Sequence, residues 1–399
     1  MKIAFVVPGF SADENDWCIP AHTDIVRELA RTNQVHVFTM RYPHRVDVYK
    51  IGNATVHSFN GVGSRGIASA RLWQNVLRAM AREQERERFD VIHAIFGSEA
   101  GCVAVSAGKL FRAPGVVWLV NGEVVGLREL GYGADLIARQ RWMNRLILRY
   151  ADCVLCGSQQ TAETARARKA KARVELLPLG VSLERFATSP SPSLSRRGAT
   201  AHPPSWQERV TAPKPAPYQG GCATFVNVGS LVSVKDQATL LVAFWRVRQQ
   251  LRDARLTIAG VGPLEEDLRA LARELEIQEC VSFAGNVPHE ELAELYRNAD
   301  VFVQASRHEG QGMAMLEAAA CGCAVCGTDV GALRDLAQAN AAVACAVGDA
   351  AALADAMLCA YTNRVGLRER ARQQVECEYN LSTLGTRLEN LYKRLKQGA

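Results

Sequence analysis

Short apolar runs alternate with longer amphipathic stretches along two separate parts of the chain. In the first part, runs rich in Val, Ile and Phe are apolar on both faces, and segments with a helical spacing of apolar residues follow them. This pattern predicts parallel strands covered by helices on both faces. The predicted strands are Lys2–Val7, Val35–Thr39, Val91–Ile95, Gly115–Leu119, Cys153–Cys156 and Val174–Leu177. The predicted helices include Asp24–Arg31, Ala70–Arg88 and Asp135–Tyr150.

The second part of the chain repeats this pattern. Its predicted strands are Thr224–Val228, Arg255–Ala259, Val281–Ala284, Val301–Ala305 and Ala324–Thr328. Its predicted helices include Gln237–Leu251, Leu264–Leu275 and Glu290–Asn298. The sequence therefore predicts an α/β protein with two doubly wound, Rossmann-like domains. Ligands of such sheets bind beyond the carboxyl ends of the strands, so we expect a site in a cleft between the domains.

A stretch rich in proline and serine separates the two parts. Seven of the fourteen prolines lie between Ala187 and Cys222, which predicts a linker or surface insertion over residues 187–222. Residues 1–186 then form the first domain and residues 223–375 the second. Leucines at helical spacing between Leu381 and Leu395 predict an amphipathic helix within residues 376–399, packed across the domain junction.

Composition narrows the class of protein. The chain has 399 residues, of which 48% are hydrophobic and 22% charged, as in ordinary globular proteins. No apolar run reaches the ~18–20 residues of a membrane helix. The apolar opening Ile3–Val7 is shorter than the ~7–15 residues of a signal-peptide core, so we expect a cytoplasmic protein whose cysteines are mostly reduced. The net charge of +6 favours anionic ligands or anionic membrane surfaces.

Glycine-containing turns follow three predicted strands of the second domain, and charged residues stand beside them. The residues of these turns are Gly229, Ser230, Lys235, Gly260, Gly262, Glu309, Gly310, Gln311 and Gly312. Glycines at a strand end leave backbone amides open to a phosphate, and Lys235 adds a point charge for a phosphate oxygen. The carboxylates of Glu309 and Glu317 would repel a phosphate, so we expect them to bind sugar hydroxyls.

The order of these motifs, continued by Gly285, Gly322 and Gly331, resembles the donor-binding domain of glycosyltransferase family 4. The first half adds matches at residues 90–94 and 177–181, so the resemblance covers nearly the whole chain. Members of this family are retaining, nucleotide-sugar-dependent enzymes with two Rossmann-like domains facing each other across a cleft, the GT-B fold. The resemblance implies that the first domain binds the acceptor and the second binds the donor.

The resemblance also implies a role for each motif residue. Lys235 would pair with the donor diphosphate, Glu317 would hold the ribose hydroxyls, and Glu309 would touch the donor sugar. The expected donor-binding residues are Gly229, Ser230, Lys235, Gly260, Gly262, Gly310, Gln311, Gly312, Met313, Ala314 and Glu317. The expected catalytic residues are Glu309, His93 and Asn121. The expected acceptor-side residues are Gly9 and Glu123.

Two positions depart from the family pattern. Ser230 stands where the family commonly has an arginine, and Arg307 is a candidate to supply the missing charge. Asn121 stands where many relatives have a histidine near the reacting sugar. These departures leave open a protein of the same fold that binds a nucleotide sugar without catalysis. A sugar phosphorylase on this fold is a further alternative.

Several motifs have structural alternatives. His93 lies in an apolar strand, where it is either a hydrogen-bonded core histidine or an acceptor-side residue. The cysteines of residues 321–326 resemble half of a metal site without a partner half, and those of residues 153–156 are expected in the core. A basic surface is either solvated or a contact for anionic lipid headgroups. Its residues are Arg141, Arg145, Arg149, Arg71, Arg78 and Arg82.

The chain contains no Asp-x-Asp pair, the usual carboxylate clamp for a divalent metal on a diphosphate, so we expect transfer without a metal or cofactor. The prediction is a retaining glycosyltransferase that moves a sugar from a nucleotide donor, such as a UDP- or GDP-sugar, to a hydroxyl of a glycan, glycolipid or small molecule. Its expected partners are the nucleotide sugar, the acceptor and an anionic membrane at the cytoplasmic face, with no nucleic acid.

Overall fold

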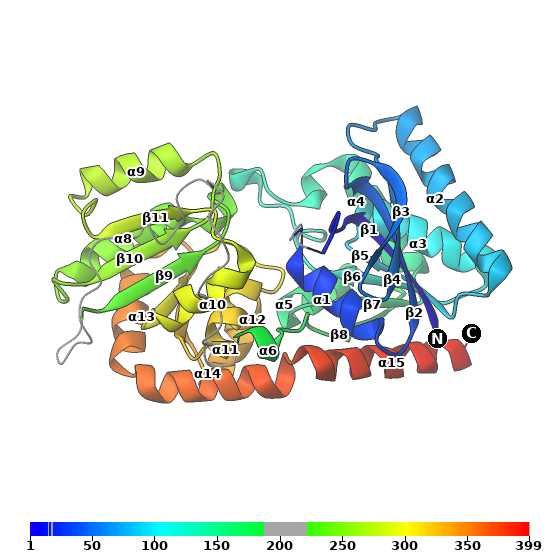
Figure 1. Ribbon diagram of the computed structural model, residues 1–399. Helices are drawn as coiled ribbons and strands as arrows, with labels where there is room; N and C mark the ends of the chain where they lie inside the picture. Colours follow the sequence, from blue (N-terminus) through cyan, green and yellow to red (C-terminus); the bar gives the residue numbers. More distant parts are fainter. Residues whose placement is uncertain (15, 17–18, 187–221, 399) are drawn as a thin grey trace, which may run out of the picture. The chain divides into compact units, whose positions relative to one another are not determined.

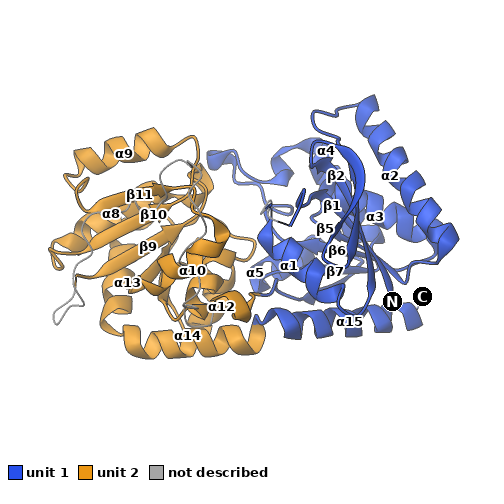
Figure 2. Cartoon of the chain, in the orientation of Figure 1, with its two compact units in different colours: residues 1–180, 379–399 blue, residues 181–378 orange. Residues whose placement is uncertain are grey.

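The computed structural model describes residues 1–14, 16, 19–186 and 222–398. The chain divides into two compact units (Figure 2). Unit 1 consists of residues 1–180 and 379–399, and unit 2 consists of residues 181–378. The linker predicted at residues 187–222 lies outside the described residues, except for Cys222.

Unit 1 is built on an eight-stranded sheet with the strand order β3-β4-β2-β1-β5-β6-β7-β8 (Figure 1). All neighbouring strands are parallel except the hairpin of β3 and β4. The strands are β1 (Lys2–Gly9), β2 (Gln34–Tyr42), β3 (Val46–Ile51), β4 (Ala54–Phe59), β5 (Val91–Ile95), β6 (Gly115–Leu119), β7 (Cys153–Cys156) and β8 (Arg173–Leu176). The α-helices are α1 (Pro20–Leu29), α2 (Ile67–Arg86), α3 (Ser98–Phe111), α4 (Ala138–Tyr150), α5 (Gln159–Ala167) and α15 (Leu381–Gln397).

Helices cover both faces of this sheet, because alternate side chains of the central strands point in opposite directions. On one face, Ile92 and Ala94 of β5 pack in a core with apolar residues of α2, α3 and α4. On the other face, His93 of β5 contacts Tyr392 of α15. Helix α1 packs against α15, so helices from distant parts of the sequence cover this second face.

Unit 2 is built on six parallel strands in the order β11-β10-β9-β12-β13-β14. The strands are β9 (Thr224–Val228), β10 (Arg255–Ala259), β11 (Val281–Gly285), β12 (Val301–Gln304), β13 (Ala324–Thr328) and β14 (Val343–Cys345). The α-helices are α6 (Leu183–Phe186), α8 (Gln237–Arg248), α9 (Glu265–Glu274), α10 (His289–Arg297), α11 (Met313–Ala320), α12 (Ala332–Gln338), α13 (Ala350–Thr362) and α14 (Arg364–Glu378). Helices α8, α9 and α13 contribute to the core on one face of this sheet.

The prediction of two doubly wound α/β sheets is confirmed. Strands β5, β6, β7, β9, β10 and β13 have the predicted bounds, and the other predicted strands differ by one to three residues at an end. The hairpin of β3 and β4 was not predicted, because β3 lacks the buried apolar pattern. Its Val46 and Val48 side chains are 75% and 61% exposed.

The two unit boundaries differ from the predicted domain boundaries at residues 186 and 375. Helix α6 belongs to unit 2, because Phe186 is buried there, with its ring centroid 5.3 Å from that of His289. Helix α14 continues unit 2 to Glu378. The predicted C-terminal helix is α15, and it packs on unit 1, where Leu388 and Leu391 are buried.

In each sheet the chain order reverses beside the first strand. The reversal lies between β1 and β5 in unit 1, and between β9 and β12 in unit 2. Loops on either side of such a switch point leave the sheet in opposite directions and open a crevice at the carboxyl ends of the strands. A ligand site is therefore expected at each of these two points.

Candidate functional site

The strand ends at the switch point of unit 2 bring a lysine and a glutamate together. Lys235 lies in a 3-10 turn after β9, and Glu309 lies in the loop after β12. The Nζ atom of Lys235 is 2.6 Å from Oε1 of Glu309, and the Ser306 hydroxyl donates to the same oxygen at 2.7 Å. The Lys235 side chain is 28% exposed and that of Glu309 is 11% exposed. An accessible ammonium group is therefore held at these strand ends.

The turns after β9 and β10 approach each other too closely for side chains. Gly260 has a φ of 142°, and a Cβ atom there would lie 2.0 Å from the carbonyl oxygen of Gly229. A Cβ atom on Gly262 would lie 2.3 Å from the carbonyl oxygen of Leu231. Ser230 is exposed beside these contacts. The glycines are thus required for packing of the two turns, and their role in phosphate binding stays a prediction.

The loop after β12 enters α11 through Gly312, whose φ of 97° favours glycine. No side chain of the described residues caps this helix. Met313 and Ala314 form its first turn, where the backbone amides and the helix dipole favour an anion. Gln311 is 2% exposed and Gly310 is also buried, so these two predicted donor-binding residues lie inside the loop.

Glu317 lies in α11 with its carboxylate hydrogen-bonded to α10. Its Oε1 atom is 3.0 Å from Nε2 of His289, and the Tyr296 hydroxyl donates to Oε2 at 3.2 Å. Burial and this carboxylate raise the pKa of Tyr296 well above its usual range, so the phenol stays a donor. The ribose-binding role of Glu317 stays a prediction. His289 and Tyr296 were missed: His289 begins α10 four residues after β11 and Tyr296 lies farther along that helix, and neither belongs to a motif that the sequence analysis identified.

Arg307, the candidate to replace the family arginine at Ser230, is paired with Asp236. Its Nε atom donates to the carboxylate of Asp236, which also caps α8. The Arg307 guanidinium is therefore already balanced. At these strand ends, each of the two cations, Lys235 and Arg307, contacts one carboxylate.

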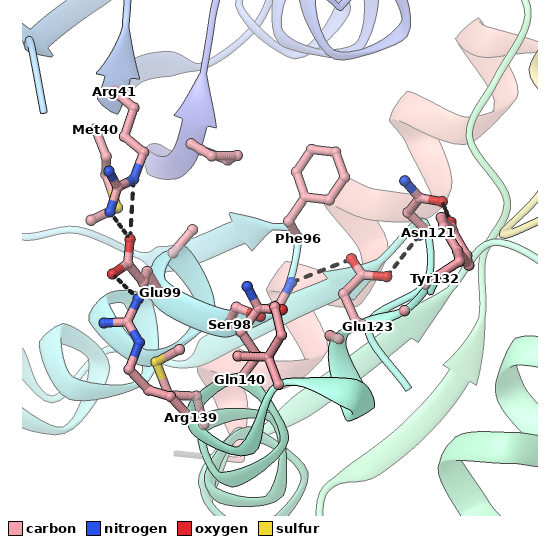
Figure 3. A pocket seen from close by; sticks show the side chains of 18 of the residues that line it. Met40, Arg41, Phe96, Ser98, Glu99, Asn121, Glu123, Tyr132, Arg139 and Gln140 are labelled. Carbon is pink, nitrogen blue, oxygen red and sulfur yellow. Dashed lines mark hydrogen bonds and ion pairs between the residues drawn. The ribbon is translucent and has the colours of Figure 1, made fainter. Parts of the chain in front are cut away.

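A cavity of about 560 Å³ opens at the switch point of unit 1 (Figure 3). Pro8 of β1, Arg41 of β2 and the loop after β5 line it, together with residues 121–123 and the first turn of α4. Both predicted residues Asn121 and Glu123 therefore belong to the lining of this cavity. The predicted Gly9 does not line the cavity and is buried within β1.

The carboxylate of Glu123 orders the backbone around this cavity. It accepts hydrogen bonds from the backbone amides of Gly97, Val120 and Asn121 at 3.4, 3.3 and 2.7 Å. Burial raises its pKa. Phe96 and Ser98 have left-handed φ values of 79° and 53°. Such backbone strain costs about 1–3 kcal/mol for each non-glycine residue and clusters at functional sites.

His93, predicted as a catalytic residue, lies in the interior of unit 1. It is 0% exposed, and its Nδ1 atom is 2.6 Å from the hydroxyl of Tyr392. Its ring stacks on that of Trp118. His93 is therefore a hydrogen-bonded core histidine, because it exposes no surface to a substrate. The side chain of His93 points from β5 toward α15, whereas its neighbours Ile92 and Ala94 pack on the face that α3 covers.

Unit 1 should lose stability in acid, because its buried histidines resist protonation. Burial lowers the pKa of His22 and His93 to about 3, and that of His36 to about 4. Unfolded histidine has a pKa near 6.5, so this stability is complete above pH 6.5 and falls as the pH drops toward 3. We expect a loss of about 2 kcal/mol per histidine by pH 5, measured by urea denaturation. His93→Gln should weaken the pH dependence, and the exposed control His44→Gln should not; equal pH dependence in both variants would contradict this account.

The cysteines of both motifs are buried, except Cys321, which is half-buried. Cys153 and Cys156 are 0% exposed in β7, as predicted for core residues, and burial raises the pKa of each to about 12. Burial likewise raises the pKa of Cys321, Cys323 and Cys326. All the described cysteines are free thiols.

One group of three metal-ligating side chains lies in the described part of the chain, between β2, β4 and α2. Nδ1 of His36 is 3.2 Å from Nε2 of His57 and 3.9 Å from Oε2 of Glu83. Nζ of Lys2 lies 3.8 Å from the same carboxylate oxygen and balances its charge. None of these residues lines the cavity of unit 1.

Comparison with known proteins matches both halves of the chain to family models. Residues 23–185 match the model of Glycosyltransferase Family 4, and residues 213–376 match that of Glycosyl transferases group 1. Among solved structures, the Anabaena protein HepE in complex with UDP and glucose is similar, with a TM-score of 0.73 and 15% identity over 99% of this chain and 100% of that one. The fold is therefore that of the two-domain GT-B glycosyltransferases.

Curated relatives share parts of the sequence. The alpha-monoglucosyldiacylglycerol synthase of Streptococcus pneumoniae is 30% identical over 46% of this chain, which is 38% of its own length. The glycogen synthase of Mycobacterium tuberculosis is 24% identical over 94% of this chain and 82% of its own. With a family model matched in each unit, the chain belongs to the glycosyltransferases of family 4 type.

Proposed function

We propose that this protein is a retaining glycosyltransferase that takes a sugar from a nucleoside diphosphate donor bound by unit 2. The observation that carries the proposal is the Lys235 ammonium group at the switch point, beside the uncapped first turn of α11. A departing diphosphate gains negative charge, and both features stabilise a negative charge at that point. The matched family models and the UDP complex of a similar fold support the same ligand class.

In the proposed transfer, the bond between the anomeric carbon and the diphosphate oxygen breaks as the acceptor oxygen attacks that carbon. The acceptor proton passes to the departing phosphate oxygen, so no protein base is required. Glu309 contacts both Lys235 and Ser306, and in the proposed transfer it stabilises the positive charge that develops on the sugar. These contacts favour front-face attack over a covalent intermediate on Glu309.

The proposal includes transfer without a divalent metal. The chain has no Asp-x-Asp pair, and Glu309 and Asp236, two carboxylates near the strand ends of unit 2, contact cations. Lys235 then supplies the charge that a metal would give to the diphosphate. The acceptor is a hydroxyl compound bound in the cavity of unit 1. The curated relatives are named for different products, a monoglucosyldiacylglycerol and glycogen, so their names do not select one acceptor for this chain.

We further propose a cytoplasmic protein that contacts anionic membranes at its surface. Among the described residues, no helix combines the length and apolar character needed to span a bilayer. The basic helix α4, which contains no acidic residue, supports an electrostatic contact.

A donor panel tests the proposed function. We expect one of UDP, GDP and ADP to raise the melting temperature, since a ligand of the folded state stabilises it by mass action. The matching nucleotide sugar should be consumed at the same rate with excess EDTA as with magnesium. Loss of turnover in EDTA with recovery in magnesium would overturn the metal-independent mechanism. Binding without any donor consumption would favour the non-catalytic alternative.

A further inference from the structure

Two arginines share one carboxylate at the wall of the cavity in unit 1. Nε and Nη2 of Arg41 lie 3.1 and 2.5 Å from Oε2 of Glu99, and Nη2 of Arg139 lies 2.9 Å from Oε1 (Figure 3). All three residues line the cavity. Two positive charges therefore meet a single negative charge where a ligand would bind.

The two arginines differ in their freedom to move. Arg41 is fixed by further hydrogen bonds to the carbonyl oxygens of Gly61 and Ser64, at 2.9 and 3.3 Å. In the described part of the chain, Arg139 forms an ion pair only with Glu99, and its side chain is 54% exposed. Arg41 is thus a preformed anchor, and Arg139 can turn from Glu99 toward a ligand without breaking the fold.

Arg139 occupies an unfavourable place for a cation. It is the second residue of α4, whose first turn contains no acidic residue and is not capped by a side chain. The positive end of the helix dipole disfavours a cation at this position. Helix α3 also starts at the cavity, at Ser98. The guanidinium groups and the two helix starts together make this wall suited to an anion.

Glu123 is the other acidic residue that lines the cavity, and it does not offset this charge. The residue Glu123 is 6% exposed, and its carboxylate accepts three backbone hydrogen bonds, so the carboxylate is turned into the protein. Ser98, Gln140 and Asn121 add polar groups to the lining. The cavity therefore offers positive charge at one wall and hydrogen-bonding groups for hydroxyls elsewhere.

We propose that this cavity binds an acceptor that carries an oxyanion, a phosphate or carboxylate, next to its hydroxyl groups. Arg139 and Arg41 bind the oxyanion, and in the free protein the carboxylate of Glu99 occupies the position of this oxyanion. A guanidinium group binds two oxygens of such an anion in parallel, which a lysine cannot do. That the bound compound is the acceptor of the transfer rests on the proposed function. The binding of an anion in this cavity rests on the geometry alone.

Glucose and glucose 6-phosphate are the probes, and calorimetry on the full chain measures their binding. We expect glucose 6-phosphate to bind at least about tenfold more tightly than glucose, as a charged hydrogen-bonded pair requires. Arg139→Gln should remove this difference. Glu99→Gln should increase the affinity for glucose 6-phosphate, because it removes the competing carboxylate. This opposite sign separates anion binding from general damage to the fold.

Arg31→Gln is the matched control. Arg31 is an exposed arginine of unit 1 that lies 2.9 Å from Glu28, the same separation as in the pair of Arg139 and Glu99. The variant Arg31→Gln should leave the binding of glucose 6-phosphate unchanged. Equal binding of both sugars by the wild type, or equal effects of Arg31→Gln and Arg139→Gln, would overturn the inference.

Vesicles distinguish the two sources of the anion. Binding to phosphatidylglycerol vesicles but not to phosphatidylcholine, lost in Arg139→Gln, would make a lipid headgroup the source. Binding of glucose 6-phosphate without such vesicle binding would make a soluble phosphate the source, and binding of neither overturns the inference. These assays contain no nucleotide sugar. An inactive donor site would therefore defeat the proposed function while leaving anion binding measurable, and an active enzyme that ignores anions would defeat only this inference.

Discussion

Lys235→Ala is expected to lower the turnover of the nucleotide sugar by about 100- to 1,000-fold, the usual cost of removing one group that stabilises a developing oxyanion. The ammonium group is the accessible cation of the pair with Glu309 at the switch point of unit 2. Without it, the diphosphate meets an uncompensated carboxylate, so both its binding and its departure become less favourable. The measurement is the kcat for donor consumption, with the melting temperature recorded beside it.

Arg372→Ala serves as the control for this variant. Arg372 is an exposed cation of unit 2 that contacts Glu376 at 2.8 Å within α14, away from the strand ends. Exposed pairs of this kind contribute only about 0–1 kcal/mol, so activity and stability should stay close to the wild type. If Lys235→Ala kept wild-type turnover with an unchanged melting temperature, Lys235 would have no contact with the reacting phosphate.

Gly260→Ala is expected to destabilise unit 2 by about 2–6 kcal/mol and to abolish nucleotide binding. The new Cβ atom would lie 2.0 Å from the Gly229 carbonyl oxygen, so the turns after β9 and β10 must separate. Overpacking and a strained backbone each cost about 1–3 kcal/mol. Urea denaturation followed by a probe in unit 2, together with calorimetry for the nucleotide, measures both effects.

Gly322→Ala separates the two costs. Gly322 also has a left-handed backbone, with a φ of 78°, but a Cβ atom there has no neighbour within 4 Å. It should lose only about 1–2 kcal/mol from backbone strain and keep its nucleotide affinity. Equal losses in the two variants would show that the contact between the turns contributes nothing.

The fold could be predicted because most strands are buried on both faces. Such strands, β5 and β9 among them, show continuous apolar runs with clear ends. The edge strand β3 could not be predicted, since solvent on one side removes the need for apolar residues such as those of β5. Its place is set by pairing with β4 across a two-residue turn at Gly52 and Asn53.

The candidate sites were predictable to different degrees. In unit 2, glycines and charged residues sit next to strand ends, so Lys235 and Glu309 could be brought together from the order of the chain. In unit 1, Arg41, Glu99 and Arg139 come from three elements and form no local motif, so only the folded chain reveals them. His93 shows a third case, because the apolar run around it does not tell which face of the sheet it occupies.

The contact between Tyr392 and His93 joins residues 299 positions apart. Because α15 covers part of one face of unit 1, this unit consists of two segments with the whole of unit 2 between them. A ribosome therefore makes residues 181–378 before it makes the last helix of unit 1. At that stage all the strands and core helices of unit 2 have been made. The face of the unit 1 sheet around His93 of β5 and Trp118 of β6 is not yet covered by α15. The later unit in the sequence is thus the first that can complete its core during synthesis.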